Sequence, residues 1–135
     1  MPWTTLTIPT FTDPRGHLQV LEGGGLPFPI RRVFWIHGVP RGVTRGGHAH
    51  GTQTQALVCM AGSLRVDLDD GRAPGSVVLD RPDRILILPP GIWAEETPLT
   101  VGVVYTVFCS GAFDPADYLR TREAWARAFP TGSGT

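Results

Sequence analysis

Glycine and proline divide this chain into short apolar runs, and that division restricts the fold more than any other feature. The 135 residues include 17 glycines and 13 prolines. Both residue types favour turns and end regular segments, so the pattern is typical of an all-β domain with many short strands. We expect strands over residues 4–8, 18–21, 32–36, 47–49, 55–61, 64–68, 75–79, 84–88 and 101–109.

The C-terminal part of the chain has the pattern of a helix. Asp114 followed by Pro115 matches an N-cap and a first helical residue. Apolar residues then recur near helical spacing as far as Phe129. The sequence therefore predicts a single domain over residues 1–130 that ends in a short helix, followed by a disordered tail over residues 131–135.

Charge and hydropathy argue against several classes of partner. The formal net charge of +0 gives no electrostatic footprint for nucleic acid or for an anionic membrane. No apolar run reaches membrane-spanning length, and residues 1–11 lack the pattern of a signal peptide. Cys59 and Cys109 lie in apolar segments, where we expect buried free thiols. We therefore expect a cytoplasmic protein with no nucleic-acid or membrane partner.

The most informative motif begins at Gly42 and continues with His48, His50, Gln55 and Gly62. Residues two apart on a strand face the same side, so both imidazoles are expected to point into one cavity beside Gln55. The spacing resembles the first cupin motif, G-x5-H-x-H-x4-E-x6-G, with glutamine in place of glutamate. This resemblance implies a cupin fold, which is a double-stranded β-helix or jelly-roll barrel.

The second cupin motif, P-x-G-x2-H, corresponds to Pro89-Pro90-Gly91-Ile92-Trp93-Ala94, with alanine where the histidine would be. Only two of the usual four metal ligands therefore remain. Catalytic sites normally have three protein ligands and an open position. We therefore expect no bound metal and no cofactor, which leaves the two imidazoles free for proton transfer. The residues that could supply a third ligand are Asp67, Asp69, Asp70, Glu95 and Glu96.

Further fragments resemble the nucleotide-sugar 3,4-ketoisomerases of the WxcM-like group, which are cupins that act on dTDP-4-keto-6-deoxyglucose. The fragments occur in the family's order over residues 11–120. They are Phe11-Thr12-Asp13-Pro14-Arg15-Gly16-His17-Leu18, Pro27-Phe28-Pro29-Ile30-Arg31-Arg32-Val33, Arg45-Gly46-Gly47-His48-Ala49-His50, Gln55-Ala56-Leu57-Val58-Cys59 and Asp117-Tyr118-Leu119-Arg120.

This resemblance implies a metal-independent isomerase that moves the carbonyl of a dTDP-4-keto-6-deoxyhexose from C4 to C3 through an enediol. His48 and His50 would be its acid and base, because the pKa of imidazole lies near working pH. Which histidine removes the proton stays open. The resemblance also implies a homodimer whose ligand is a nucleotide-linked deoxysugar.

Five further residues are candidate contacts for the substrate. Arg15 and Arg45 stand at motif positions, and a guanidinium group binds phosphate well. Trp35 and Trp93 could stack against a base or a sugar ring. Gln55 could fix a histidine tautomer or bind a sugar hydroxyl. A structural salt bridge remains an alternative role for Arg15. Packing in the barrel remains an alternative role for Trp35 and Trp93.

Two departures from the family keep other functions open. Phe34-Trp35 stands where the family has a tyrosine pair, and Ala94 stands where it has a histidine. A non-catalytic sugar-binding cupin is therefore one alternative. A dTDP-sugar 3,5-epimerase is another, but that enzyme pairs a histidine with an aspartate and a tyrosine acid, and the sequence shows no clear counterpart of the tyrosine. A metal-dependent dioxygenase or isomerase is the third alternative.

Overall fold

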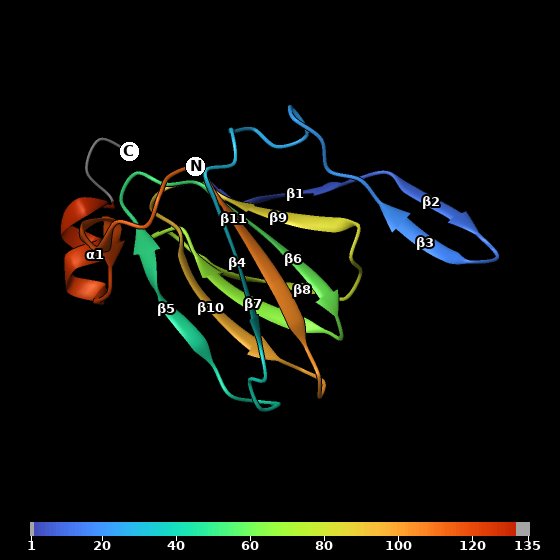
Figure 1. Cartoon of the computed structure of the whole chain (residues 1–135). Helices are drawn as coiled ribbons and strands as arrows, with labels where there is room; N and C mark the ends of the chain where they lie inside the picture. Colours follow the sequence, from blue (N-terminus) through green and yellow to red (C-terminus); the bar gives the residue numbers. More distant parts are fainter. Residues whose placement is uncertain (1, 132–135) are drawn as a thin grey trace.

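A computed structural model describes residues 2–131 of the chain, and over these residues it forms two five-stranded antiparallel sheets and a separate hairpin (Figure 1). The strands are β1 (Thr4–Thr7), β2 (Thr10–Asp13), β3 (Gly16–Gln19), β4 (Arg32–His37), β5 (Arg45–His50), β6 (Gln55–Ala61), β7 (Leu64–Asp69), β8 (Pro74–Leu79), β9 (Arg84–Leu88), β10 (Trp93–Pro98), β11 (Val104–Cys109) and β12 (Tyr118–Leu119). The helical segments are η1 (Pro115–Asp117) and α1 (Arg122–Ala128).

The two sheets lie face to face as the walls of a jelly roll. The strand order is β1-β9-β6-β11-β4 in one sheet and β12-β5-β10-β7-β8 in the other, while β2 and β3 pair only with each other. Figure 1 shows this hairpin extending away from the sheets, and α1 at the opposite end of the molecule. The predicted all-β cupin fold with a short C-terminal helix is confirmed.

The main core lies between the two sheets. On β7, Leu64, Val66 and Leu68 are buried and alternate with half-buried polar residues, as a strand with one covered face requires. They belong to the same buried cluster as Leu57 of β6 and Val107 of β11. This cluster fills much of the space between the two sheets, and some of its members also border the polar cavity described below.

The sequence located some strands well and missed others. The bounds of β6 and β9 are those predicted, because both strands are apolar and end at glycine or proline. The hairpin strand β2 and the strand β10 were not predicted. In β10 two adjacent glutamates hide the alternation, since Trp93 and Glu95 lie on the outer face and Ala94 and Glu96 line the interior.

The predicted helix is correct only in its second half. Asp114 does cap a helical turn through the backbone amide of Ala116, but η1 ends at Asp117. The chain then pairs with β5 as β12, and α1 begins only at Arg122, with Thr121 as its N-cap. Sheet pairing therefore outweighs the helical spacing of these residues, and the expectation of helix from Pro115 onward was wrong.

Three smaller expectations can be compared with the structure. Cys59 and Cys109 are free and buried, as predicted. Within residues 2–131 no helix is long and apolar enough to cross a membrane. Of the predicted disordered tail over residues 131–135, residues 132–135 lie outside the described residues.

Gly91 lies in close contact with Phe129, the C-cap of α1, so its substitution tests how the helix packs on the barrel. Its φ is 87°, a Cβ there would lie 2.7 Å from Cδ1 of Phe129, and its carbonyl accepts a hydrogen bond of 2.9 Å from Nε1 of Trp125. Backbone strain costs roughly 1–2 kcal/mol and overpacking adds roughly 1–3 kcal/mol. Gly91→Ala should therefore lower the free energy of unfolding in urea by roughly 2–5 kcal/mol.

Gly102→Ala is the matched control, because Gly102 has a φ of 79° and no heavy atom within 4 Å of an added Cβ. It should lose only the strain contribution of roughly 1–2 kcal/mol. Equal losses in the two variants would contradict the close packing of Phe129 on Gly91.

Candidate active site

A polar cavity of about 400 Å³ lies between the two sheets, near the edge where β4 faces β5. A narrower recess continues inward from it and shares His48, Gln55 and Glu96 with the cavity. The cavity is lined by Arg32, Phe34, Ile36, Arg45, Gly46, His48, Gln55, Glu96, Tyr105, Val107, Tyr118 and Arg120. The recess adds His50, Gln53, Leu88, Pro89, Ile92 and Ala94.

The motif strand β5 brings the two histidines together. His48 pairs in register with Ala94 of β10, and His50 pairs with Tyr118 of β12. The two imidazole rings are 5.1 Å apart between centroids and nearly perpendicular, at 84°. The sequence expectation that both rings face one cavity therefore agrees with the geometry.

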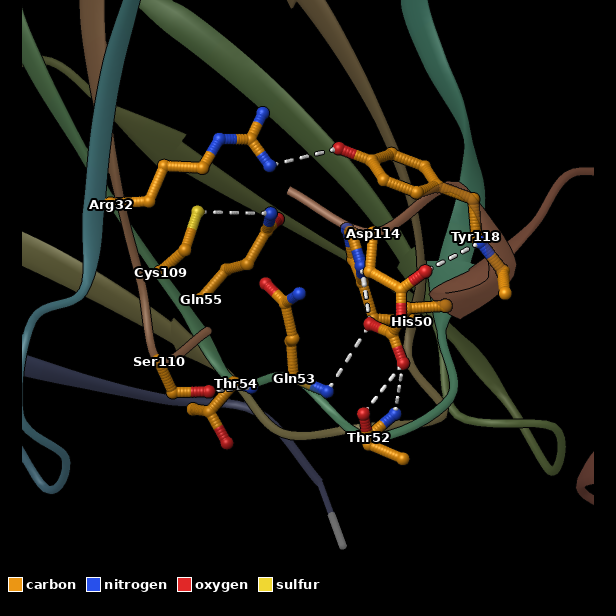
Figure 2. Close-up of polar contacts among 12 residues, drawn as sticks. Arg32, His50, Thr52, Gln53, Thr54, Gln55, Cys109, Ser110, Asp114 and Tyr118 are labelled. Carbon is orange, nitrogen blue, oxygen red and sulfur yellow. Dashed lines mark hydrogen bonds and ion pairs between the residues drawn. The ribbon is translucent and has the colours of Figure 1, made fainter. Parts of the chain in front are cut away.

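Asp117 fixes the ring of His50. Its Oδ2 lies 3.0 Å from Nδ1 of His50, and both side chains are almost completely buried. The same carboxylate accepts hydrogen bonds from the backbone amide and the hydroxyl of Thr52, each at 2.7 Å, and from the amide of Gln53 at 3.3 Å. Figure 2 shows these contacts of His50, at the end of β5, and of Thr52 and Gln53, in the loop after it.

The protonation states follow from burial and from these neighbours. Burial, with repulsion from His50 and Arg120, lowers the pKa of His48 to about 4. Burial also lowers the pKa of His50, although the carboxylate of Asp117 opposes that shift. Burial works to raise the pKa of Asp117, but the hydrogen bonds from Thr52, His50 and Gln53 hold it below its ordinary value. Near pH 7 both imidazoles are therefore neutral and Asp117 is charged.

This arrangement assigns the tautomer of His50. A carboxylate can only accept hydrogen bonds, so Nδ1 of His50 carries the proton and Nε2 is left with its lone pair. Nε2 is buried and has no hydrogen-bond partner among the described residues. A neutral imidazole with a free Nε2 and a carboxylate on Nδ1 is suited to accept a proton.

Tyr118 covers both histidines from the side of β12. The centroid of its ring lies 5.0 Å from that of His48 and 4.5 Å from that of His50. Its hydroxyl accepts a hydrogen bond of 3.4 Å from the guanidinium group of Arg32, which Figure 2 shows crossing from the facing sheet. The guanidinium group of Arg120 lies over the same tyrosine ring, 4.4 Å from its centroid.

Positive charge gathers around the same cavity. Arg32, Arg45 and Arg120 come from β4, β5 and the residue after β12, and all of them line the cavity. One guanidinium group can bind two phosphate oxygens at once, so the arrangement favours an anionic ligand such as a diphosphate.

Of the residues predicted for the site, the structure brings His48, His50, Arg45 and Gln55 together. Gln55 is buried, and its amide nitrogen donates to the sulfur of Cys109 at 3.5 Å (Figure 2). It therefore contributes a polar group to the cavity wall and makes no hydrogen bond to either histidine among residues 2–131.

Arg15, Trp35 and Trp93 do not line this cavity. Arg15 lies in the turn of the β2–β3 hairpin, its side chain is 89% exposed, and it pairs with Asp13. Trp35 is 64% exposed, because β4 alternates and turns Arg32, Phe34 and Ile36 inward. The expectation that Trp35 lines the cavity was therefore wrong, and Phe34 is the aromatic residue of β4 on the cavity wall.

Trp93 is likewise on the outer face of its sheet. It packs against Trp125 of α1 at 5.6 Å between ring centroids, and its indole nitrogen donates to Glu95 at 2.9 Å. The inward position next to it is taken by Ala94. Trp93 therefore packs against the C-terminal helix on the outer face, and it neither lines the cavity nor fills the barrel interior.

The donor set of the cavity does not fit a metal site. Within residues 2–131 no three histidine, cysteine, aspartate or glutamate side chains come together in a geometry that could hold a metal ion. Gln55 and Ala94 occupy the positions where cupin metal sites have glutamate and histidine.

Sequence reasoning gave no role in the site to Arg32, Asp117, Tyr118 and Arg120. The last three lie in a fragment that resembles the family, but the helical spacing of this region hid their position beside β5. The signal that could have located them is the family fragment itself, read as a strand. Glu96 was considered only as a metal ligand, because β10 was not predicted.

The chain matches the model of the FdtA family, described as WxcM-like, C-terminal, over residues 1–129. It is 38% identical over 109 residues to the TDP-4-oxo-6-deoxy-alpha-D-glucose-3,4-oxoisomerase of Aneurinibacillus thermoaerophilus, covering 80% of this chain and 78% of that protein. It also resembles QdtA, a sugar 3,4-ketoisomerase of Thermoanaerobacterium thermosaccharolyticum solved with TDP, with a TM-score of 0.91, 30% identity and coverage of 94% and 93% of the two chains.

A histidine-to-asparagine variant of QdtA, solved with TDP-4-keto-6-deoxyglucose, has a TM-score of 0.93 to this chain at 28% identity, with 98% and 97% of the two chains covered. NovW, a 4-keto-6-deoxy sugar epimerase of Streptomyces spheroides, has a TM-score of 0.74 at 22% identity, with 86% and 67% covered, and so shares the fold alone. Because the family model spans nearly the whole chain, the protein belongs to the FdtA (WxcM-like, C-terminal) family.

Proposed function

We propose that this protein is a TDP-sugar 3,4-ketoisomerase, which moves the carbonyl of a TDP-4-keto-6-deoxyhexose from C4 to C3. The observation that carries the proposal is the 3.0 Å hydrogen bond between His50 and Asp117 in a cavity ringed by arginines. It supports a proton-transfer site next to an anion-binding site. Relatives named as enzymes of this reaction cover most of the chain.

In the proposed mechanism His50 is the base. Its Nε2 removes the proton on C3, the electron pair forms the C3–C4 double bond of an enediol, and the same nitrogen returns the proton to C4. Asp117 stabilises the imidazolium that exists between these two steps. His48 stays neutral, since its pKa of about 4 makes it a weak base, and it donates a hydrogen bond to a sugar oxygen.

Binding in this proposal depends on the charge around the cavity. Arg32, Arg45 and Arg120 would hold the diphosphate, which places the hexose toward the recess that contains His50. Gln55 would hydrogen-bond a sugar hydroxyl. No step requires a metal or a cofactor.

We also propose a homodimer in the cytoplasm, as the resemblance to the family implies. The β2–β3 hairpin supports the dimer, because Phe11 and Leu18 on it are each 60% exposed. Arg15 in the same hairpin would reach a substrate only in the cavity of a partner subunit. Trp35 and Trp93 are not part of the proposed binding site.

A 3,5-epimerase is the second candidate, and one observation favours it. That activity pairs a histidine with an aspartate and a tyrosine acid, and Tyr118 lies 4.5 Å from the ring of His50, between centroids, beside Asp117. Tyr118 is therefore a candidate for the tyrosine acid that could not be identified from the sequence.

The decisive experiment is incubation with TDP-4-keto-6-deoxyglucose in deuterated water, followed by NMR of the sugar. We expect the carbonyl to move to C3, with the same result in the presence of EDTA. Deuterium should appear at C4 only to the extent that the imidazolium of His50 exchanges its proton with solvent before returning it. Exchange at C3 and C5 with the carbonyl still at C4 would establish the epimerase instead. Binding without carbonyl migration or exchange would indicate a non-catalytic sugar-binding protein.

The role of Asp117 predicts a specific loss of turnover. Asp117→Asn leaves a hydrogen-bonding group beside His50 but removes the charge that stabilises its imidazolium, so kcat should fall by roughly 10²–10⁴. The kcat of the His50→Asn variant should fall by at least as much. Both effects are measured by initial rates of isomerisation, with TDP affinity measured separately by calorimetry.

His37→Asn is the matched control, because His37 is exposed at the end of β4 and lies outside the cavity. It should retain full activity. An Asp117→Asn variant with wild-type kcat would contradict the proposed role of the His50–Asp117 pair.

A further inference from the structure

Glu96 is a half-buried residue with a buried Oε2 atom; its carboxyl group faces the cavity and has no function in the proton transfer by His50. It lies on β10 two residues after Ala94, so both side chains point to the interior and line the recess. Its neighbour Glu95 points outward and accepts the hydrogen bond from Trp93. A single strand thus carries one carboxyl group at the reaction cavity and another on the outer face.

The surroundings of Glu96 are built around its carboxyl group. Its Oε2 is buried and has no hydrogen-bond partner among the described residues. Gly46 makes room for it, since a Cβ at residue 46 would collide with Oε2 of Glu96 and lie 2.8 Å from the carbonyl of Ala94. Gly46 has a φ of 89°, which also favours glycine. An unpartnered buried oxygen in a shaped space is suited to a ligand that donates a hydrogen bond.

We propose that Glu96, in its protonated form, is a further catalytic residue, which gives a proton to O4 of the sugar and takes one from O3. This role rests on the proposed function and extends it. His50 moves a proton from C3 to C4 but does not account for the proton that must leave O3 or the one that must reach O4. Glu96 would carry out these two transfers.

The two oxygen transfers by Glu96 are coupled to the two carbon transfers by His50. When His50 removes the proton on C3, the C3–H electron pair forms the C3–C4 double bond, and the C4 carbonyl π pair takes a proton from Glu96 to give an enediol. The carboxylate then accepts the O3 proton, the O3 electron pair forms the new carbonyl, and the double-bond pair takes the proton held by His50 at C4. Both residues return to their starting states, and no other reactant is needed.

The charges that face Glu96 fit this role. Burial, opposed by Arg45 and assisted by Glu95, raises the pKa of Glu96 to about 7, so a proton is available near neutral pH. Val66 of β7, opposite it in register, carries no charge. The other titratable groups on the walls of the cavity and the recess are Arg32 of β4, Arg45, His48 and His50 of β5, Tyr105 of β11, Tyr118 of β12 and Arg120.

Two of these groups are poorer proton donors. His48 is neutral near pH 7, because its pKa is about 4. Burial, assisted by the charge of Glu96, raises the pKa of Tyr105. An acid whose pKa lies near the working pH is the most efficient in both directions, which singles out Glu96.

The test compares Glu96→Gln with Glu95→Gln, its matched control on the outer face. We expect Glu96→Gln to lower kcat for isomerisation by roughly 10²–10⁴, with TDP affinity unchanged. Glu95→Gln removes only the smallest of the influences on the pKa of Glu96, so its kcat should stay within a few-fold of wild type. Because the protonated form is required, wild-type activity should decline as pH rises through about 7, and Glu96→Gln should lose that decline.

A second measurement does not depend on turnover. The carboxyl carbon of Glu96, assigned in NMR spectra by its absence in Glu96→Gln, should titrate near pH 7 and not near the ordinary 4.5. A midpoint near 4.5, or a fully active Glu96→Gln beside an inactive Tyr118→Phe, would overturn the role of Glu96 and leave the isomerase intact. A wild-type protein that binds TDP but converts no sugar would overturn the proposed function and this role with it.

Discussion

The buried carboxylate of Asp117 is the interaction on which the rest of the site depends. It joins the loop after β5, through Thr52 and Gln53, to the end of η1, and it orients the ring of His50. A charged carboxylate is stable in such a place only when several donors surround it. The donors come from residues adjacent in sequence to the histidine motif. The local fold of the histidine motif and the docking of the C-terminal segment therefore depend on the same set of hydrogen bonds.

Burial then separates two electrostatic regions in one cavity. Arginines surround the wider part, while the recess holds neutral imidazoles and a carboxyl group whose pKa is raised to about 7. A ligand with an anionic group at one end and an uncharged ring at the other matches both regions. The low pKa of His48 and the raised pKa of Glu96 have the same cause, which is that the interior disfavours charge of either sign.

The sequence predicted the architecture because its signals are local. Strands such as β6 and β9 end at glycine or proline, and the spacing of His48, His50 and Gln55 depends only on the period of a strand. The remainder depends on pairing between distant segments. Tyr118 has helical spacing in the sequence but pairs with His50 in the sheet, and no local rule reports that competition. The face of a strand was also misjudged, since one residue of offset turns Trp35 outward and Phe34 inward.

The short stretch from Asp114 to Thr121 lies outside the two buried cores that hold the sheets together, yet it carries Asp117, Tyr118 and Arg120. Asp117 holds His50, Leu119 packs against Trp93 and Trp125, and Thr121 caps α1, so these three residues fix the stretch in place. The side chains of Tyr118 and Arg120 face the cavity. Substitution of these two side chains alone would change the surface offered to a ligand while the residues that anchor the stretch are kept.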